Sequence, residues 1–410
     1  MQTTSIVRYV LIAAIVLILA ALGGWYFFIR AKQAEIKEAD TGRGTSLPEQ
    51  SLGSAFGSTY ENIVSSLSSM VSGERSADAQ VQRLAQVNKS QTAGAGFVES
   101  GTSTRLRFVE RGTGFIFDVI PETLALERLT NTLILRTYEA FVAADGRLLV
   151  RGTEEDGGVT TIVASVAATS TSDGSRMLTQ QRLPNGIRSI TANTTGREIL
   201  YVVEGSTGAV ASRAAWDGTK AKEVFASAIS GWQLHWLGSE RIILVQNPSD
   251  NIPGYSYEVQ KNGAFVPLLR AIPGLTLLPH PSSRALLYGA SGGTLTLFAR
   301  TSATSTSGSL PIRTTADKCV WDPKQQFIAY CAVPQSLPAP SFLDRWYRGE
   351  VHTADAWWRV DAGAASAELL FSPGNAVLDV ERPVIDNSGN YIAFVNAVDK
   401  SLWLLRIEEQ

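Results

Sequence analysis

Hydrophobic and polar residues alternate in short runs along most of this chain. From about residue 94 onwards, stretches rich in Val, Ile, Leu and aromatic residues are separated by turns of Gly, Asn, Asp and Ser, a pattern typical of short antiparallel strands. One unit, made of a strand, a tight polar turn and a hydrophobic strand, recurs. Its copies are FVESGTSTRLRFV, YEAFVAADGRLLVRG, SITANTTGREILYVV, LHWLGSERIILVQ, LTLLPHPSSRALLYG, CVWDPKQQFIAYC and RPVIDNSGNYIAFVN.

The spacing of these copies predicts the architecture. One hydrophobic position after each turn marks each copy: Leu106, Leu149, Ile199, Ile242, Leu286, Ile328 and Ile392. Successive positions are 43, 50, 43, 44, 42 and 64 residues apart. Apart from the last interval, these spacings are close to the repeat of a four-stranded propeller blade, which is about 40–45 residues. Several copies continue with two further strands, as in residues 112–130 and 292–300. The sequence therefore predicts an all-β fold, a seven-bladed β-propeller over residues 93–410, whose stacked blades bury their sheet faces.

The turns of this unit resemble those of a known family. DPKQQ, DNSGN and AADGR, followed by IAY, IAF and LLV, together with the closing SLWLLRI, look like the WD40-like or TolB-type β-propeller repeat family. The likeness covers roughly residues 94–410. Most copies lack the family's full Pro-Asp-Gly-Lys turn, and the Gly-His and Trp-Asp pairs of true WD40 repeats do not recur at regular spacing. The resemblance implies a propeller with a binding role and no specific ligand.

Residues 9–29, YVLIAAIVLILAALGGWYFFI, are 21 residues without a charge. A helix of this length crosses a hydrocarbon core, and Trp25 and Tyr26 stand where amphipathic aromatic residues favour the membrane interface. A cleaved signal peptide is the alternative, but its apolar region is normally shorter and is followed by a small-residue cleavage site. We predict a single transmembrane helix over residues 9–29 that anchors the chain in the cytoplasmic (inner) membrane.

The orientation of this helix has two interpretations. Arg30, Lys32 and Lys37 follow the helix and only Arg8 precedes it, which by the positive-inside rule favours a cytoplasmic C-terminal domain. A large domain, however, is translocated largely regardless of such charges, and the composition after the helix is typical of an exported protein. We expect residues 1–8 to be cytoplasmic and the propeller to be extracytoplasmic.

Two segments separate the helix from the propeller. Residues 30–58 are charged and then rich in Gly, Ser and Thr, too poor in apolar residues to form a core, and they predict a flexible stalk. Residues 59–92 predict a short helical segment, because apolar residues recur there at helical spacing. These residues are Ile63, Leu67, Met70 and Val71, then Val81, Leu84 and Val87.

The only two cysteines, Cys319 and Cys331, lie in one copy of the repeat. Strands joined by a tight turn are antiparallel, so the two cysteines share one face. With a loop centred on Gln325 they face each other within disulfide reach, whereas a loop centred on Lys324 makes them diagonal neighbours that cannot bridge without strain. Two buried free thiols are the alternative. We predict a disulfide, because an exported domain lies where such bonds persist.

The interval of 64 residues before Ile392 contains an insertion of about 20 residues after Val333. Its sequence, PQSLPAPSFLDRWYRGEVHTADAWW, gathers the aromatic residues and arginines that are enriched at binding hot spots, and long loops on a rigid scaffold commonly carry function. The candidate interaction residues are Asp344, Arg345, Trp346, Tyr347, Arg348, Asp355 and Trp357. The alternative is an insertion that covers a blade face, with Trp357 and Trp358 starting the next strand.

Composition and motifs argue against several kinds of chemistry. A formal charge of -2 gives no reason to expect a nucleic-acid partner. GASGG at residues 289–293 matches the nucleophile-elbow pattern, but strands on both sides make it a hairpin rather than a strand-to-helix turn. His235, His280 and His352 lie in separate copies without metal-ligand spacing. We expect no metal and no cofactor, and structural roles for the histidines.

These observations favour a binding protein over an enzyme. A site in the central channel needs acidic or histidine residues on the first strands of several blades, which offer mainly AFVA, SITA, LHWL, LTLL, CVW and PVID, with Asp386 as the only clear acid. We expect a membrane-anchored propeller that serves as a protein or glycan interaction platform in the cell envelope. The alternative is an envelope hydrolase or lyase with its site in the channel.

Overall fold

The computed structural model describes residues 83–408, except residues 101–102, 156, 172–173, 194, 293, 337, 339–340 and 375. The predicted N-terminus (1–8), transmembrane helix (9–29) and stalk (30–58) lie outside the described residues, as does most of the predicted helical segment (59–92). Within the described part, no helix is both long and apolar enough to cross a membrane. The described residues belong to one compact unit.

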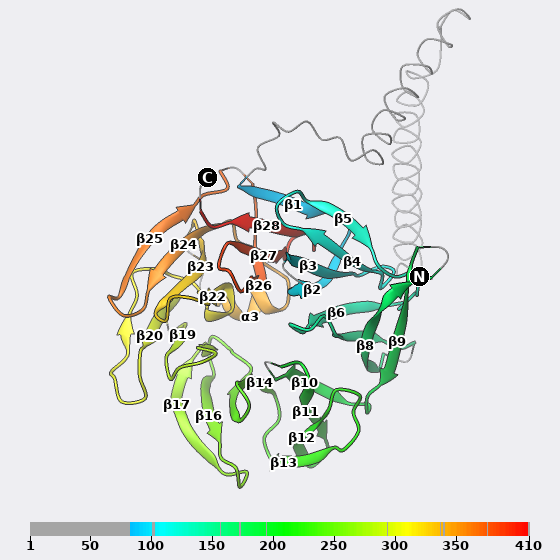
Figure 1. The fold of residues 1–410 in the computed structure, drawn as a ribbon. Coiled ribbons are helices and arrows are strands. Elements are labelled where there is room, and N and C mark those ends of the chain that lie inside the picture. The colour runs from blue at the N-terminus through cyan, green and yellow to red at the C-terminus, as the bar shows by residue number, and fades with distance from the viewer. Residues whose placement is uncertain are drawn as a thin grey trace, which may run out of the picture. The chain divides into compact units, whose positions relative to one another are not determined.

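The described residues form 28 strands in seven four-stranded antiparallel sheets, arranged as blades around a central channel (Figure 1). Blade 1 contains β2 (Thr92–Ser100), β3 (Ser103–Glu110), β4 (Ile116–Ile120) and β5 (Ala125–Arg128). Blade 2 contains β6 (Thr137–Val142), β7 (Leu148–Thr153), β8 (Val159–Ser170) and β9 (Arg176–Arg182). Blade 3 contains β10 (Ile187–Ala192), β11 (Glu198–Gly205), β12 (Gly208–Ala215) and β13 (Lys222–Ser227). Blade 4 contains β14 (Trp232–Leu237), β15 (Arg241–Gln246), β16 (Pro253–Val259) and β17 (Phe265–Pro273).

Blades 5 to 7 complete the ring. Blade 5 contains β18 (Thr276–Pro279), β19 (Leu286–Ala290), β20 (Thr296–Arg300) and β21 (Gly308–Ser309). A 3-10 helix, η1 (Ala316–Lys318), leads into blade 6, which contains β22 (Cys319–Trp321), β23 (Ile328–Pro334), β24 (Asp355–Asp361) and β25 (Ser366–Phe371). Helix α3 (Phe342–Tyr347) lies between β23 and β24. Blade 7 contains β26 (Val380–Ile385), β27 (Tyr391–Asn396), β28 (Leu402–Arg406) and β1 (Leu84–Asn88).

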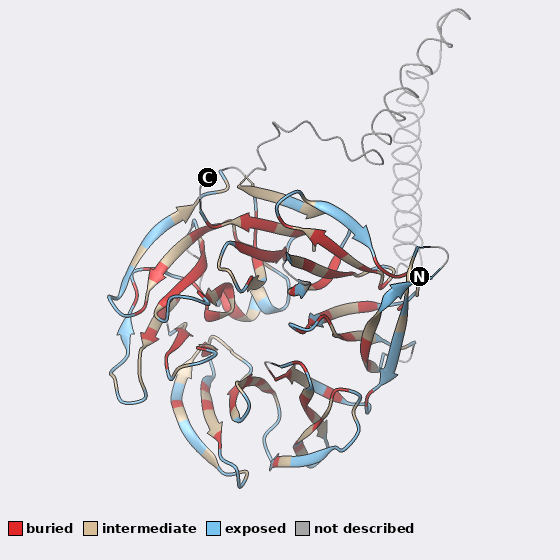
Figure 2. Ribbon diagram, viewed as in Figure 1, coloured by how far each residue is buried: buried red, intermediate tan, exposed pale blue. Residues whose placement is uncertain are grey.

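The predicted seven-bladed propeller is confirmed, and the repeat positions explain how its core forms. All seven lie on the second strand of a blade, where both faces of the sheet meet a neighbouring blade, and all seven are buried (Figure 2). They are Leu106, Leu149, Ile199, Ile242, Leu286, Ile328 and Ile392. The GASGG stretch falls between β19 and β20, the second and third strands of blade 5, as the hairpin interpretation requires.

Strand β1 corrects the sequence prediction. It is the outermost strand of blade 7 and pairs with β28, with Leu84 opposite Leu405. Residues 84–88 are therefore strand and not helix, and the propeller begins before residue 93. The apolar spacing of this segment also fits a helix, but pairing along β28 satisfies its backbone groups, and such tertiary context overrides a weak local pattern.

Buried polar side chains shape the turns between the first and second strands. Asp322 Oδ1 accepts hydrogen bonds from two backbone N–H groups of its turn, at 2.7 and 2.8 Å. Asp386 Oδ1 does the same in blade 7, at 2.8 Å for both bonds. His280 Nδ1 takes this role in blade 5, with two N–H donors at 3.1 Å, and burial lowers the pKa of His280, which favours the neutral acceptor form. Asp386 thus serves a turn rather than the channel.

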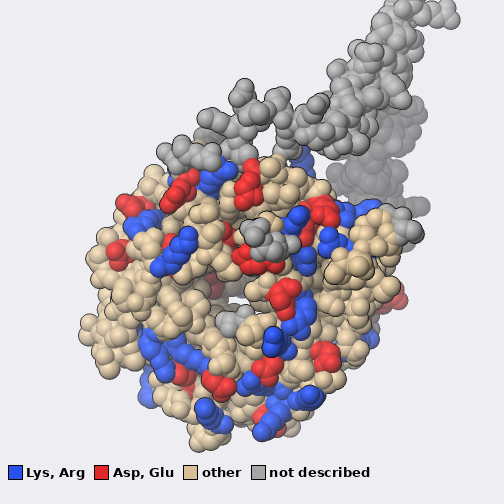
Figure 3. Space-filling model, viewed as in Figure 1, with Lys and Arg blue, Asp and Glu red and all other residues tan. Residues whose placement is uncertain are grey.

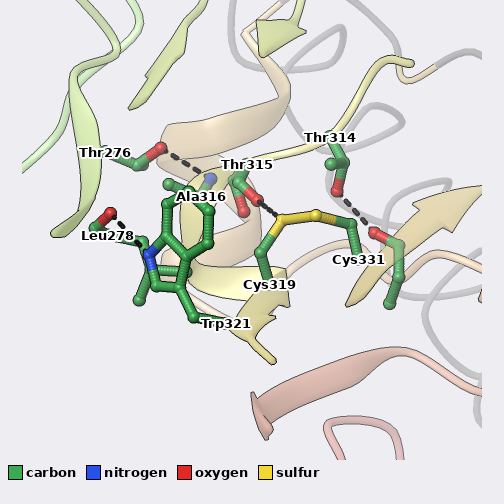
Figure 4. Close-up of a disulfide and its surroundings, with 9 residues drawn as sticks. Thr276, Leu278, Thr314, Thr315, Ala316, Cys319, Trp321 and Cys331 are labelled. Carbon is green, nitrogen blue, oxygen red and sulfur yellow. Dashed lines mark hydrogen bonds between the residues drawn. A yellow bond between two sulfur atoms is a disulfide. The ribbon is translucent and has the colours of Figure 1, made fainter. Parts of the chain in front are cut away.

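Cys319 and Cys331 face each other directly across β22 and β23, and a disulfide joins them (Figure 4). Their Cα atoms are 4.1 Å apart. Both side chains are buried in the core between blades 5 and 6. Nearby, Trp321 Nε1 donates to the Leu278 carbonyl (3.3 Å) on the innermost strand of blade 5. The disulfide therefore stabilises a hairpin that also holds two blades together.

The closing strand gives a first testable prediction. Removing residues 1–82 retains β1, so the remaining chain should unfold in one cooperative transition. Removing residues 1–88 deletes β1 and exposes the edge of β28, and we expect the Tm to fall by on the order of 10 °C, as a loss of several kcal/mol does in a domain of this size. Differential scanning calorimetry measures both, and equal melting temperatures for the two deletions would refute a closing role for β1.

The disulfide gives a second prediction. The double variant Cys319→Ala/Cys331→Ala should lose about 2–3 kcal/mol of unfolding free energy, the value expected for a loop of this short length, measured by guanidinium unfolding without reductant. When the wild-type protein is denatured and alkylated without reduction, mass spectrometry should detect no alkylated cysteine. Two alkylated cysteines in protein taken from the cell would contradict the prediction.

Candidate functional site

The insertion between β23 and β24 folds into α3, which lies toward the middle of the ring and not on its rim (Figure 1). Asp344 ties the helix to the β15–β16 connection of blade 4. Its backbone N–H donates to Asp250 Oδ2 (3.0 Å), and its Oδ2 accepts from Ser249 Oγ (3.2 Å). These contacts join segments more than ninety residues apart in sequence.

Two aromatic residues tie the other end of α3 to blades 6 and 7. Trp346 Nε1 donates to both carboxylate oxygens of Asp379, at 2.9 and 3.0 Å. Tyr347 OH donates to Asp317 in η1. The helix ends at Tyr347, and Gly349 shortly after it has a φ of +70°, a left-handed conformation that favours glycine. Helix α3 therefore spans from blade 4 to blades 6 and 7.

Lys318 lies beneath this helix and is fully buried. Lysine is almost never fully buried unless its charge is paired. Here Nζ donates to Asp355 Oδ2 (2.6 Å), Asp379 Oδ1 (2.5 Å) and Thr353 Oγ1 (2.8 Å). Its ammonium group also lies 4.9 Å from the centre of the Trp346 ring, a cation–π distance. All the donors of this ammonium group are thus satisfied within the protein.

The pKa of Asp379, one of the two carboxyl groups around Lys318, is shifted by its surroundings. Burial alone raises the pKa of Asp379, but the Lys318 charge and the hydrogen bonds from Lys318, Trp346 and His352 outweigh it, so the pKa of Asp379 is lowered. Asp379 is therefore ionised at neutral pH. Because its pKa is lower in the folded chain than in the unfolded chain, its stabilising contribution is present at neutral pH and is lost as the pH falls below about 4.

This cluster gives a third prediction. Lys318→Met leaves Asp355 and Asp379 buried without their cation, and removing one partner of a buried ion pair costs about 3–5 kcal/mol. Lys222→Met is the matched control, because Lys222 is exposed, and it should change stability by less than about 0.5 kcal/mol. Urea unfolding measures both variants. A Lys318→Met variant as stable as the control would show that the cluster does not hold the fold together.

A cavity of about 720 Å³ lies beside α3. Its lining comes from four regions: the helix and its following loop, the innermost strand of blade 4, η1, and blade 7. Tyr347 is 42% exposed there, and His352 Nδ1 lies 2.9 Å from Asp379 Oδ2. The lining residues are Gln233, Asp317, Trp346, Tyr347, Gly349, His352, Glu381, Arg382, Ala397, Val398 and Lys400. This volume and mixture of aromatic and polar groups suit a small-molecule or oligomer-binding site.

The central channel forms a second cavity, of about 790 Å³, lined mainly by the innermost strands of blades 1 to 4 and 7. Gln233 and Arg382 line both cavities, so the two spaces are adjacent. Figure 3 shows the channel mouth with acidic and basic side chains around it. Phe141, on the innermost strand of blade 2, is 45% exposed in this second cavity.

The charged side chains of the channel wall pair with one another. Glu139 Oε2 accepts from Arg151 (2.7 Å), and its Oε1 lies 3.0 Å from Arg382. Lys400 Nζ donates to Glu381 Oε2 (2.8 Å). The wall is therefore polar, but most of its charged side chains are neutralised by neighbouring side chains of opposite charge.

Three titratable groups that line the cavities have shifted pKa values. Burial raises the pKa of Asp317 and raises the pKa of Tyr347 well above its usual value, which favours the protonated form of each. Burial also lowers the pKa of His235 to about 4, so this histidine is neutral at neutral pH. Its Nε2 is buried and has no partner among the described residues. No group of three or more metal-ligating side chains occurs in the described part of the chain.

No protein-family model matches the chain, and no curated protein matches it. Solved structures match its fold. Oligogalacturonate lyase from Vibrio parahaemolyticus is 9% identical, with 81% of this chain and 95% of that chain covered and a TM-score of 0.52. Virginiamycin B lyase from Staphylococcus aureus is 12% identical, with 79% and 98% covered and a TM-score of 0.51.

A third similar structure is the β-propeller domain of the Trilobed protease from Pyrococcus furiosus, described as having an open velcro topology. It is 10% identical, with 78% of this chain and 97% of that chain covered and a TM-score of 0.50. At such low identity the likeness shows the fold alone. The chain has the fold of a seven-bladed β-propeller. Unlike an open ring, its first and last strands pair.

The structure separates the seven predicted interaction residues. Trp346 and Tyr347 line the cavity, while Arg345 and Arg348 lie on the exposed side of the insertion, where both approach Glu350. Asp344 fastens the helix to blade 4, as described above. Asp355 and Trp357 belong to β24 and are buried, Trp357 in the core between blades 6 and 7. For Trp357 the structural alternative holds.

The channel charges are the functional candidates that the sequence analysis missed. Glu139, Arg188, Glu381 and Arg382 stand near the start of the innermost strands, whereas the motifs considered covered mainly the later half of each strand. Contrary to the sequence prediction, Asp386 is therefore not the only acid of the first strands, because Glu139 and Glu381 also lie there. The signal that could have revealed them is a charged residue directly before the quoted stretch in three blades: Glu139 before AFVA, Arg188 before SITA and Arg382 before PVID.

Proposed function

We propose that this protein is a single-pass, membrane-anchored propeller that binds a protein or glycan partner in the cell envelope. The uncharged segment 9–29 supports the anchor, and the disulfide between Cys319 and Cys331 supports an extracytoplasmic propeller, since disulfides persist in oxidising compartments. In this arrangement residues 1–8 are cytoplasmic and residues 30–58 act as a stalk.

The observation that carries the binding function is the cavity beside α3. A four-stranded blade needs only a short turn between its second and third strands, but here an inserted helix is fastened to blades 4, 6 and 7. The result is a preformed recess that leaves Tyr347 42% exposed. Preformed cavities with aromatic and polar lining are the usual form of binding sites, and a fixed geometry lowers the entropic cost of binding.

Crosslinking in intact cells tests the proposal. Partners crosslinked to the full-length protein should be captured less by about tenfold when Tyr347 is replaced by Ala, because an exposed aromatic anchor is removed without touching the core. Leu369→Ala is the matched control, since Leu369 is 55% exposed on the outer strand of the same blade, and it should capture normally. Equal capture by both variants would contradict a binding role for the cavity.

Trp346 needs separate treatment in this experiment. It is half-buried, donates to Asp379 and covers Lys318, so Trp346→Ala should lower thermal stability as well as partner capture. Tyr347→Ala should still melt cooperatively and should lose less stability than Trp346→Ala, because it removes a single hydrogen bond, the one to Asp317. Loss of cooperative melting in Tyr347→Ala would mean that this ring belongs to the core and not to a site.

A second candidate function is a hydrolase or lyase with its site in the channel. The observation that favours it is the hydrogen-bonded pair of Asp317 and Tyr347, which lines the cavity adjoining the channel and whose pKa values are both raised. Such pairs are candidates for general acid or base chemistry. Turnover of a glycan or peptide that is abolished in Asp317→Asn would establish this function. Binding of such a substrate without turnover would support the interaction platform and not the enzyme.

A further inference from the structure

Exposed aromatic rings occur at only two places in the part of the chain that the structure describes. Among all its Phe, Tyr and Trp side chains, only Phe141 (45%) and Tyr347 (42%) are exposed. Phe141 lines the channel cavity and Tyr347 lines the cavity beside α3. A propeller that buries or half-buries every other described ring, yet exposes one in each adjacent cavity, has surfaces suited to contact flat apolar faces of a ligand.

The two cavities together favour an elongated ligand. They share Gln233 and Arg382 as common walls, and they measure about 720 and 790 Å³. Each volume lies within the range of single ligand sites. A ligand that used both rings would therefore extend through both cavities, as an oligomeric chain does and a single small molecule does not.

The charges of the combined lining cancel. Four acidic and four basic side chains line the two cavities: Glu139, Glu204, Asp317 and Glu381, with Arg151, Arg188, Arg382 and Lys400. Seven of them take part in four ion pairs. These pairs are Glu139–Arg151, Glu139–Arg382, Glu381–Lys400 and, at 3.9 Å, Glu204–Arg188. Asp317 bonds to Tyr347. A charged ligand would have to break such pairs, whereas hydroxyl groups can bond to their remaining lone pairs and N–H groups.

We infer that the channel binds an uncharged oligosaccharide, with one sugar ring on Tyr347 and another on Phe141. The apolar C–H face of a sugar ring can pack on an aromatic ring. The hydroxyl groups around its edge can bond to the paired carboxylates, the guanidinium groups and the Gln233 amide. This inference rests on the proposed binding function and specifies its ligand class. A uronate polymer does not fit this inference. Its repeated carboxylates would need several free basic side chains, and the basic side chains of this lining are paired with acidic ones.

A peptide is the other elongated ligand to consider. Peptide recognition normally relies on pockets for individual side chains or on strand addition at a free sheet edge. The lining here instead combines apolar residues with paired charged side chains and the Gln233 amide. Such fixed donors and acceptors suit the many hydroxyl groups of a sugar chain. A peptide is therefore an outcome that the experiment must be able to reveal.

Calorimetric titration of the full-length protein in detergent tests the inference. The probes are uncharged glucose, galactose and N-acetylglucosamine oligomers, from monomer to hexamer, with galacturonate oligomers and a mixture of uncharged peptides alongside. We expect at least one uncharged series to bind, with affinity that rises with chain length. Tyr347→Ala and Phe141→Ala should each weaken the longer oligomers by about tenfold, the effect of losing one aromatic contact. Leu369→Ala should bind normally. All three variants should melt cooperatively, and Tyr347→Ala should lose only the contribution of its hydrogen bond to Asp317.

The outcomes separate this inference from the function on which it rests. Preference for galacturonate oligomers or for peptides would overturn the inference and leave the binding function in place. Binding of an uncharged series that both aromatic variants retain at full strength would also overturn it, since the site would lie elsewhere. Absence of binding by every probe overturns the glycan ligand. The proposed function fails only if crosslinked partner capture is also independent of Tyr347.

Discussion

The buried ammonium group of Lys318 is the interaction on which the site depends. Its desolvation is offset by two carboxylates and a hydroxyl group that arrive from three segments: the loop before β24, β24 itself and the residue before β26. The same Asp379 accepts from Trp346 of α3. One charge therefore fixes the interface of blades 6 and 7 and the position of the inserted helix, because moving any partner would leave a buried charge uncompensated.

The channel shows a different use of charge. Its pairs are half-exposed and contribute little to stability individually, but they define a polar wall with fixed donors and acceptors. Two of the similar structures are lyases and one is a propeller domain of a protease, which illustrates that this fold hosts unrelated functions. The function of this chain therefore has to be argued from its own inserted helix, its paired charges and its exposed rings.

The fold was largely predictable from the sequence because each blade repeats a local pattern. Residues such as Leu106 and Ile392 occupy equivalent buried positions, so their spacing counts the blades, and the long interval before Ile392 locates the inserted helix. The site was less predictable. Lys318 and Asp379 are 61 residues apart, and no local pattern marks a lysine that becomes buried only when two blades stack. Trp357 was included for its residue type, although its place on β24 makes it core.

Strand β1 has a consequence for the order of folding. Leu84 of β1 pairs with Leu405, and Arg83, just before the strand, donates to the carbonyl of Arg406, 323 residues later in the chain. The first strand of the described ring therefore stays without its neighbour until the last blade has been synthesised. Contacts of such long sequence separation form slowly. During that time β1 and the edge of blade 7 are open to pairing with other chains. The edges of β1 and β28 are protected from pairing with other chains only once these two strands have paired. Closure of the ring therefore depends on β28 as much as on β1.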